Sequence, residues 1–224
     1  MRMLALTAFE TAAEVPALAA EEIHLWLVDV PATISRRALS AFAHAELGRL
    51  LGIYSGIEAP VAFARNDHGK PHALDTNYPQ FNLSHGGQRL ALAFARERAI
   101  GVDVEALGRR RSSLELAERF FAAEEAHALA ALDPIEQQAA FINLWTCKEA
   151  VLKALGRGIA FGLDRLRFDM HGMIPDNLVE IAEEAGAVAE WQVLRFDAGS
   201  DHAGALAWHG SDLRVRAMRG RQVS

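Results

Sequence analysis

The chain has 224 residues, of which 51% are hydrophobic, and 23 basic residues against 29 acidic ones give a net charge of −6. The apolar content is sufficient for a folded core and excludes intrinsic disorder, while the acidic balance argues against a dedicated nucleic-acid-binding protein. At about 150 residues per domain, the length favours one or two domains. The only cysteine, Cys147, allows no intrachain disulfide and fits a reducing cytoplasm.

The first residues of the chain include a short apolar run from Met3 to Phe9. Glu10 and Glu14 interrupt the longer apolar stretch that a signal peptide needs, so we expect none. Apolar runs elsewhere also stop short of the roughly 18 residues that a transmembrane helix requires. We therefore expect a cytoplasmic protein that does not enter a membrane.

The predicted elements mix strands and helices, which favours an α+β fold. In the first half, a helix is predicted at 35–51 and strands at 23–28, 61–64, 81–83, 90–95 and 100–105. In the second half, helices are predicted at 112–121, where Ser112 and Glu115 form a capping box, and from Asp133 to near Gly156. Further strands are predicted at 166–169, 190–196, 203–209 and 213–218.

Two segments, 90–105 and 204–218, have similar sequences, and each is predicted to form a hairpin. An internal duplication is one interpretation, and the general likeness of any two amphipathic hairpins is the other. If the duplication is real, Asp103 and Glu105 correspond to Arg216 and Met218, so the second copy has lost the acids and one acidic site remains.

The strand at 101–105 places Asp103 and Glu105 on one face, because side chains alternate along a strand. Two carboxylates in this arrangement provide half of a site for a hard cation such as Mg²⁺. The more common interpretation of such alternation is a solvated outer face of a half-buried strand.

The long second-half helix aligns Trp145, Glu149 and Lys153 at spacings of four residues, so they share one face. Glu149 and Lys153 alone form an ordinary helix salt bridge. Lys148 is more unusual, because it lies in the apolar stripe and must either extend to water or find an anion.

A strand leads into Ser84-His85-Gly86-Gly87, and a turn contains Gly69-Lys70-Pro71. Glycines allow backbone N–H groups to approach a phosphate, and Ser and His add donors, although a capped glycine turn is the more common interpretation. The chain contains three lysines, Lys70, Lys148 and Lys153, and all three lie in these motifs.

Taken in order, Gly69-Lys70-Pro71, Asn82-Leu83-Ser84-His85, Gly101-Val102-Asp103-Val104-Glu105 and Trp145-x-x-Lys148-Glu149-Ala150-x-x-Lys153 resemble the motifs of one family. The chain is similar to the 4'-phosphopantetheinyl transferases of the longer, two-lobed type. The resemblance implies two similar α/β lobes with pseudo-twofold symmetry, which we place at 1–108 and 109–224, with coenzyme A between them.

The resemblance also implies an activity: Mg²⁺-dependent transfer of the phosphopantetheine arm of coenzyme A to a serine of an acyl or peptidyl carrier protein, releasing 3',5'-ADP. Asp103, Glu105 and Glu149 would hold Mg²⁺, and Glu149 is also the candidate base. The coenzyme A contacts implied are Ser84, His85, Lys148 and Lys153 at the phosphates, Gly69, Lys70 and Pro71 at the adenine end, and Arg37, with Arg36 nearly equivalent, at the 3'-phosphate.

Two other functions remain open from the sequence. One is a Mg²⁺-dependent nucleotidyl transferase or phosphohydrolase, and the other is an inactive homologue that binds carrier proteins. The run Arg109, Arg110 and Arg111 is either a docking site for an acidic carrier protein or a solvated linker. Because two lobes in one chain supply their own cleft, we expect a monomer.

Overall fold

The computed structural model describes residues 1–57, 61–108 and 113–220. The helices are α1 (Leu39–Ser55), α2 (Ser113–Phe120), α3 (Ala123–Ala130) and α4 (Pro134–Leu155). The strands are β1 (Arg2–Leu4), β2 (Glu10–Thr11), β3 (Glu22–Asp29), β4 (Phe63–Arg65), β5 (Pro71–Ala73), β6 (Gln80–Gly86), β7 (Arg89–Ala95), β8 (Ile100–Ala106), β9 (Leu166–His171), β10 (Ile174–Ile181), β11 (Trp191–Asp197), β12 (His202–His209) and β13 (Arg214–Arg219). Short 3₁₀ helices lie at Leu6–Ala8, Gly158–Phe161, Leu163–Arg165, Glu183–Ala185 and Val188–Glu190.

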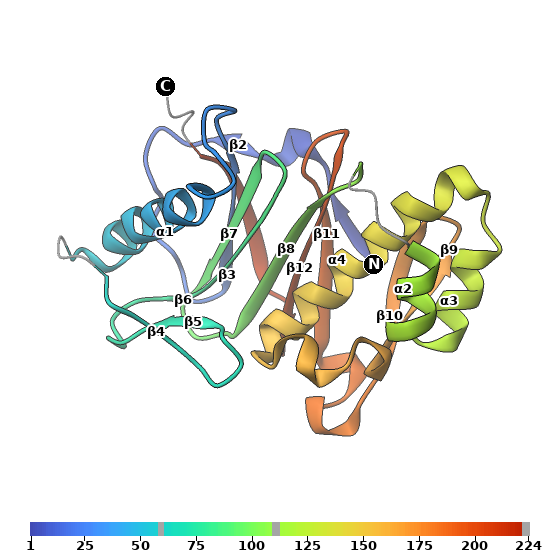
Figure 1. Ribbon diagram of the computed structural model, residues 1–224. Helices are drawn as coiled ribbons and strands as arrows, with labels where there is room; N and C mark the ends of the chain where they lie inside the picture. The colour runs from blue at the N-terminus through green and yellow to red at the C-terminus, as the bar shows by residue number, and fades with distance from the viewer. Residues whose placement is uncertain (58–60, 109–112, 221–224) are drawn as a thin grey trace.

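Two sheets face each other, and each carries a long helix on its outer side (Figure 1). α1 covers a five-stranded sheet of order β2-β13-β3-β7-β6, and α4 covers a four-stranded sheet of order β1-β11-β12-β8. β4 with β5 and β9 with β10 form two small additional sheets. This arrangement confirms the predicted α+β class. Within the described ranges, the helices are too short or too polar to cross a membrane.

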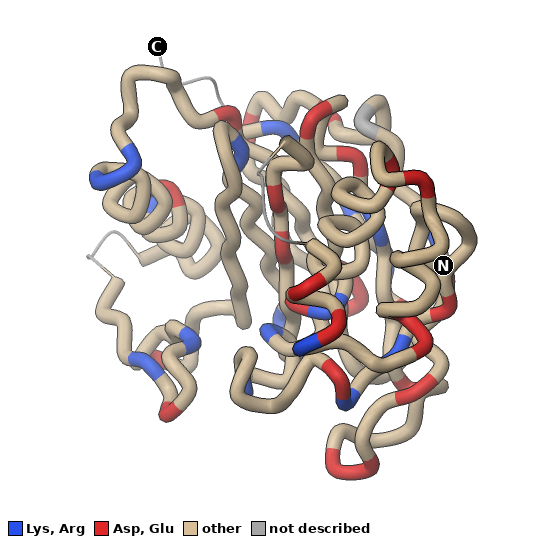
Figure 2. Tube along the Cα trace, turned by 45° about the vertical axis from the view of Figure 1, so that its right-hand side comes forward, with Lys and Arg blue, Asp and Glu red and all other residues tan. Residues whose placement is uncertain are grey.

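Side-chain alternation explains how one sheet serves two cores. In β3, Leu25 and Leu27 point into the core between the sheets, whereas Trp26 and Val28 pack toward α1. Because both faces of this sheet are covered, its central strands are apolar at nearly every position rather than at every second one. In the view of Figure 2, Lys and Arg are interspersed with Asp and Glu along the described trace.

α4 begins and ends as predicted. The Asp133 carboxylate accepts a hydrogen bond of 3.0 Å from the Ile135 N–H, and Gly156 ends the helix with φ of 70°. α1 begins at Leu39 rather than at Ser35, because the Ser35 carbonyl closes a turn with the N–H groups of 38 and 39. α3 was not predicted, and Ser112 of the predicted capping box lies outside the described residues.

The two predicted hairpins do not form. β7 pairs with β3 and β6, whereas β8 pairs antiparallel with β12 in the other sheet. In the same way, β12 pairs with β11 and β8, whereas β13 lies beside β3. An alternating pattern specifies which face of a strand is buried but not which strand lies beside it, so the sequence could not reveal this exchange.

Strands from both sides of the expected boundary at residue 108 therefore occur in both sheets. The first half supplies the adjacent strands β6 and β7, and its next strand, β8, joins the other sheet. The second half supplies the adjacent strands β11 and β12, and its next strand, β13, also joins the other sheet. The reciprocal placement of β8 and β13 is the pattern that an internal duplication would produce. It also connects the two halves through backbone hydrogen bonds, in addition to side-chain packing.

Lys148 lies inside the core beneath α4, which corrects the expectation that it contacts coenzyme A. Its side chain is wholly buried, and its Nζ lies 2.6 Å from Oε2 of Glu125 on α3. The ammonium also donates to the carbonyls of Leu163 and Leu166. Burial lowers the pKa of Lys148 and raises that of Glu125, while the attraction between the two charges opposes both shifts. The anion that Lys148 requires in the apolar stripe is therefore the carboxylate of Glu125.

We expect Lys148→Met to lower the free energy of unfolding by about 3–5 kcal/mol, because the Glu125 carboxylate would stay buried without its counter-charge. The double variant Lys148→Met/Glu125→Gln removes both charges and keeps an acceptor for the Phe168 N–H, so it should regain more than half of that loss. Urea unfolding at neutral pH measures both variants. A single variant as stable as the unchanged chain would contradict the structural role of this pair.

Candidate active site

β6 and β8 lie side by side where the two sheets meet, and each is the edge strand of its own sheet. In place of a backbone ladder, side chains connect them. The Val102 N–H donates to Oδ1 of Asn82 at 2.8 Å, so an amide side chain replaces a strand carbonyl. At Gly86 the approach is so close that an added Cβ would lie 2.5 Å from the Val104 carbonyl oxygen. This junction is the frame of the candidate site.

Two of the three lysines cap the carbonyls on this open edge of β8. Lys70 donates to the Ile100 carbonyl at 3.0 Å, and Lys153 donates to the Val102 carbonyl at 3.3 Å. Lys70 also donates to the carbonyl of Lys153 at 2.7 Å, which ties the β4–β5 hairpin to the last turn of α4. Burial, followed by repulsion from Lys153, lowers the pKa of Lys70 to about 8.

Ser84, Asp103 and Lys153 form a compact hydrogen-bonded cluster. Oδ1 of Asp103 accepts from the Ser84 hydroxyl at 2.7 Å and from Nζ of Lys153 at 2.6 Å, while Lys153 also donates to Oγ of Ser84 at 3.0 Å. Asp103 is only 4% exposed. The interpretation of this strand face as solvated is therefore wrong at Asp103, because β6 and α4 cover it.

The remaining predicted carboxylates lie on the two elements that carry this cluster. Glu105 is half-buried two residues after Asp103 on β8, and Glu149 is buried one helical turn before Lys153 on α4. α4 packs closely on β8 because Gly101 has no side chain; an added Cβ there would lie 2.0 Å from the Ala150 carbonyl oxygen. Gly101 thus brings the acids of the strand and the helix to one region.

These carboxylates fit a hard cation by ligand chemistry without forming a finished metal centre. In the described part of the chain, no three acidic, histidine or cysteine side chains are gathered closely enough to hold a metal by themselves. Oδ2 of Asp103, however, is buried and accepts no hydrogen bond from any described residue. Such an oxygen is costly to bury and suits a cation, with phosphate oxygens as further ligands.

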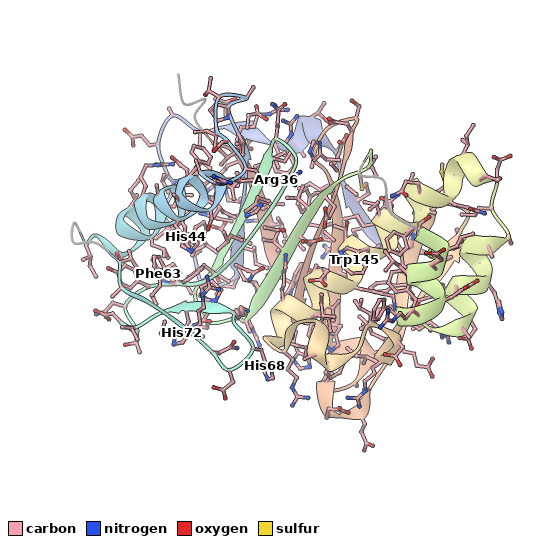
Figure 3. All side chains as sticks on the ribbon, viewed as in Figure 1. Arg36, His44, Phe63, His68, His72 and Trp145 are labelled. Atoms are coloured by element: carbon pink, nitrogen blue, oxygen red, sulfur yellow. The ribbon has the colours of Figure 1, made fainter. Side chains whose placement is uncertain are left out.

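A cavity of about 620 Å³ lies at the end of β6, and we call it the turn cavity. It is lined by His85, Gly86, Gly87 and Glu105, together with Arg36 from the segment before α1 (Figure 3). Of the two predicted basic residues, Arg36, the second choice, lines this cavity, whereas Arg37 is not among its lining residues. The sequence could not separate them because both precede a helix whose start was itself misplaced.

A second cavity, of about 400 Å³, lies at the beginning of β6, and we call it the hairpin cavity. Lys70 and Pro71 line it, as do Phe81 and Gly156. His68 and His72 lie on the same hairpin (Figure 3). Gly69 forms the hairpin turn with φ of 84° and is not among the lining residues. The Ser84–Asp103–Lys153 cluster is thus located between two cavities at opposite ends of β6.

One residue of the site had no predicted role. Asn82 belongs to the motif Asn82-Leu83-Ser84-His85, but its hydrogen bond to the other sheet was not predicted. The available signal was a polar residue at a buried position of an apolar strand. The predicted docking run, Arg109, Arg110 and Arg111, lies outside the described residues.

Comparisons with known proteins show which family the chain resembles. A family model described as the 4'-phosphopantetheinyl transferase superfamily matches residues 99–210, half of the chain, including Asp103, Glu105, Glu149 and Lys153. The 4'-phosphopantetheinyl transferase HetI of Nostoc is 39% identical over 64% of this chain and 72% of its own length. Sfp of Bacillus subtilis, which carries the same description, is 35% identical over 51% and 50%.

The matched regions cover only part of the relatives. A Synechocystis relative is 35% identical over 65% of this chain and 61% of its own length, and AcpT of Salmonella typhimurium is 38% identical over 40% and 47%. The chain therefore spans between about half and three quarters of the relatives it matches. On the family model and on the extent of the match to HetI, the chain belongs to the 4'-phosphopantetheinyl transferase superfamily.

Proposed function

We propose that this protein transfers the 4'-phosphopantetheine group of coenzyme A to a serine hydroxyl of an acyl or peptidyl carrier protein, with release of 3',5'-ADP. The observation that carries this proposal is the Ser84–Asp103–Lys153 cluster between two cavities, of which Asp103 and Lys153 lie within the residues that match the family. The relatives' descriptions name the same transfer chemistry.

The two cavities suit an elongated anionic ligand. Six residue steps along β6, at about 3.3 Å each, separate its ends by about 20 Å, so a ligand reaching both cavities would pass the cluster. Arg36 and His85 are at one end, Lys153 is in the middle, and Lys70 is at the other end. We assign the pyrophosphate to Ser84, His85 and Lys153 and the adenine end to the hairpin cavity beside Lys70 and Pro71. Because the 3'-phosphate is carried by the same ribose as the adenine, it belongs at that end too, and Arg36 at the opposite end is assigned to the pyrophosphate side of the ligand.

Asp103, Glu105 and Glu149 are the residues that would hold Mg²⁺ together with the pyrophosphate of coenzyme A. When bound, the ion supplies charge stabilisation for the bridging and leaving oxygens. Lys153 adds a point charge on the phosphate under attack. Its contact with Asp103, at 2.6 Å, supports this role, because it holds the ammonium beside the proposed metal ligand.

The transfer itself is a substitution at phosphorus. The serine oxygen of the carrier protein forms a bond to the phosphorus of the phosphopantetheine arm, and the bond from that phosphorus to the oxygen of 3',5'-ADP breaks. The serine proton must leave, because a neutral hydroxyl is a weak nucleophile. We assign Glu149, directly or through water, as the base that accepts it, since its carboxylate lies on the same helix face as Lys153.

We also propose a cytoplasmic, monomeric enzyme. The hairpin cavity is lined by residues from both halves of one chain, the turn cavity is lined by residues of the first half, and the only cysteine is buried. Mixing the protein with coenzyme A, Mg²⁺ and an apo carrier protein tests the activity directly. A gain of one phosphopantetheine in the mass of the carrier supports it, whereas hydrolysis of coenzyme A without that gain would indicate a phosphohydrolase. Carrier binding without chemistry would indicate an inactive homologue.

The first prediction for this function concerns Asp103. Asp103→Asn keeps the size of the side chain and a carbonyl oxygen for Ser84 and Lys153 but removes the charge, so we expect transfer to fall at least about a hundredfold. Asp169→Asn, an exposed position on β9, is the control and should leave the rate unchanged. Transfer assays and thermal melts on the same samples measure both. A fully active Asp103→Asn protein that melts normally would defeat the assignment of the site.

The second prediction separates two roles of Glu149. Glu149→Gln keeps the shape but loses charge and basicity, and we expect at least about a hundredfold loss of rate, the size of effect typical of a removed general base. If the carboxylate is mainly a base, added Mg²⁺ should restore little activity, and the acidic limb of the rate–pH profile should flatten. Glu136→Gln, in the first turn of α4, is the matched control. Full recovery at high Mg²⁺ would show that Glu149 is only a ligand.

The third prediction concerns the carrier protein. We propose that Arg109, Arg110 and Arg111 help to dock an acidic carrier, since they directly follow the segment that contains Asp103 and Glu105. Replacing all three by Glu should raise the KM for the carrier and weaken its dependence on salt, because the electrostatic attraction is removed. The KM for coenzyme A provides the internal control. An unchanged carrier KM and salt response would identify the run as a solvated linker.

A further inference from the structure

His202, at the start of β12, makes an unexpected contact across the two sheets. Its side chain is buried, and the residue is 7% exposed. Nε2 of His202 lies 2.9 Å from the carbonyl oxygen of Gly86, at the end of β6. Gly86 and the next residue, Gly87, line the turn cavity, whereas His202 lies behind them and does not line it. We propose that His202 is a positioning residue that fixes this turn by donating hydrogen bonds from both of its ring nitrogens.

The protonation state follows from the two partners of the ring. Nδ1 lies 2.7 Å from Oδ1 of Asp201, and Nε2 faces the Gly86 carbonyl. A carbonyl oxygen can only accept, and the hydrogen bond from His202 is the main reason that the pKa of Asp201 is lowered, so the carboxylate also accepts. A neutral imidazole carries one N–H and could satisfy only one of these partners. The geometry therefore requires the imidazolium form.

The charges around the ring are compatible with a cation. Asp201 is largely exposed, so its carboxylate balances the buried ring at little cost in desolvation. From β7, Arg89 faces the same segment but is paired with Asp29 at 2.6 Å. On β11, Asp197 accepts from the Gly199 N–H, and on β8, Glu105 is in register with Ala203, the residue after His202. Asp201 is thus the acid in contact with the ring, while Asp197 and Glu105 lie on the neighbouring strands, each in register with Ala203.

The turn is held at both of its ends. Gly86 and Arg89 are register partners, so the turn itself contains only Gly87 and Gln88, and φ of 56° at Gly87 is typical of a type II' hairpin turn. His202 contacts the Gly86 end, while Nε of Arg89 donates to the Ala198 carbonyl at 2.7 Å. Both contacts reach the segment 198–202 of the other sheet. The turn is therefore clamped at two points across the junction.

The clamp leaves no free space behind the turn. An added Cβ at Gly87 would lie 2.7 Å from Nε2 of His202, and one at Gly86 would lie 2.5 Å from the Val104 carbonyl oxygen. If His202 lost the proton on Nε2, a bare nitrogen would face a carbonyl oxygen at 2.9 Å, and the two acceptors would repel. The turn would then move, and with it one wall of the cavity that contains Arg36 and His85. Ligand affinity should accordingly fall when the hydrogen bond from Nε2 of His202 is lost.

The proposal is tested first without any ligand. Nitrogen-15 NMR of the histidine rings should show both nitrogens of His202 protonated at neutral pH. His202→Phe fills the space but donates nothing, so we expect amide hydrogen exchange at Val30, whose N–H donates to the Gln88 carbonyl of the turn at 3.0 Å, to accelerate about tenfold or more, the cost of one charge-assisted hydrogen bond. His202→Gln retains a donor for the Gly86 carbonyl and should exchange almost as slowly as the unchanged chain. His209→Gln, at the other end of β12, is the control.

The second measurement uses coenzyme A as the probe and rests on the proposed function. By calorimetry, the Kd should rise about tenfold or more in His202→Phe. His202→Gln, which retains a donor for the Gly86 carbonyl, should bind coenzyme A nearly as tightly as the unchanged chain, a rescue that filling the space alone would not produce. A bare ring nitrogen, or unchanged Val30 exchange in His202→Phe, would overturn the proposal, as would equal effects in His209→Gln. If coenzyme A fails to bind the unchanged chain, the proposed function fails, while the ring protonation and Val30 exchange still decide the role of His202.

Discussion

The open edge of β8 is the constraint on which the rest of this structure depends. β8 pairs with β12 on one side only, and its other side faces β6 of the opposite sheet without a backbone ladder. Buried backbone groups must be satisfied, and here side chains satisfy them: Asn82 for the Val102 N–H, and Lys70 and Lys153 for two carbonyls. Because two of these partners are cations, the junction gathers positive charge beside the buried carboxylate of Asp103.

The same junction explains how a structural arrangement also serves as a ligand site. Lys153 caps a strand carbonyl, neutralises Asp103 and donates to Ser84, so one ammonium connects α4, β8 and β6. Gly101 allows this geometry, since any larger residue would separate α4 from β8. In the described chain, each of the three lysines donates to at least one backbone carbonyl. These three positions need a compact ammonium with three donors in a confined space, which explains why they are lysine in a chain whose other basic residues are arginine.

The two halves of the chain are connected at the strands rather than by a hinge. β8 and β13 each lie in the sheet of the other half, and the clamp formed by His202 and Arg89 adds side-chain contacts at the β6–β7 turn. A cleft between two freely moving lobes would lose its shape when the lobes rotate. Exchanged strands prevent that rotation because it would break backbone hydrogen bonds in both sheets. The cavities at the two ends of β6 are accordingly features of a single rigid junction.

Local patterns in the sequence predict the α+β class, the limits of α4, the acidic face of β8 and most residues of the candidate site. These follow from local chemistry, since a cap, a period or a motif depends on neighbours along the chain. The exchange of β8 and β13 is not predictable in this way, because alternation specifies a buried face and not a partner strand. The positions of two basic residues also depend on the fold. Lys148 pairs with Glu125 on a helix that was not predicted, and Arg36 rather than Arg37 lines the turn cavity.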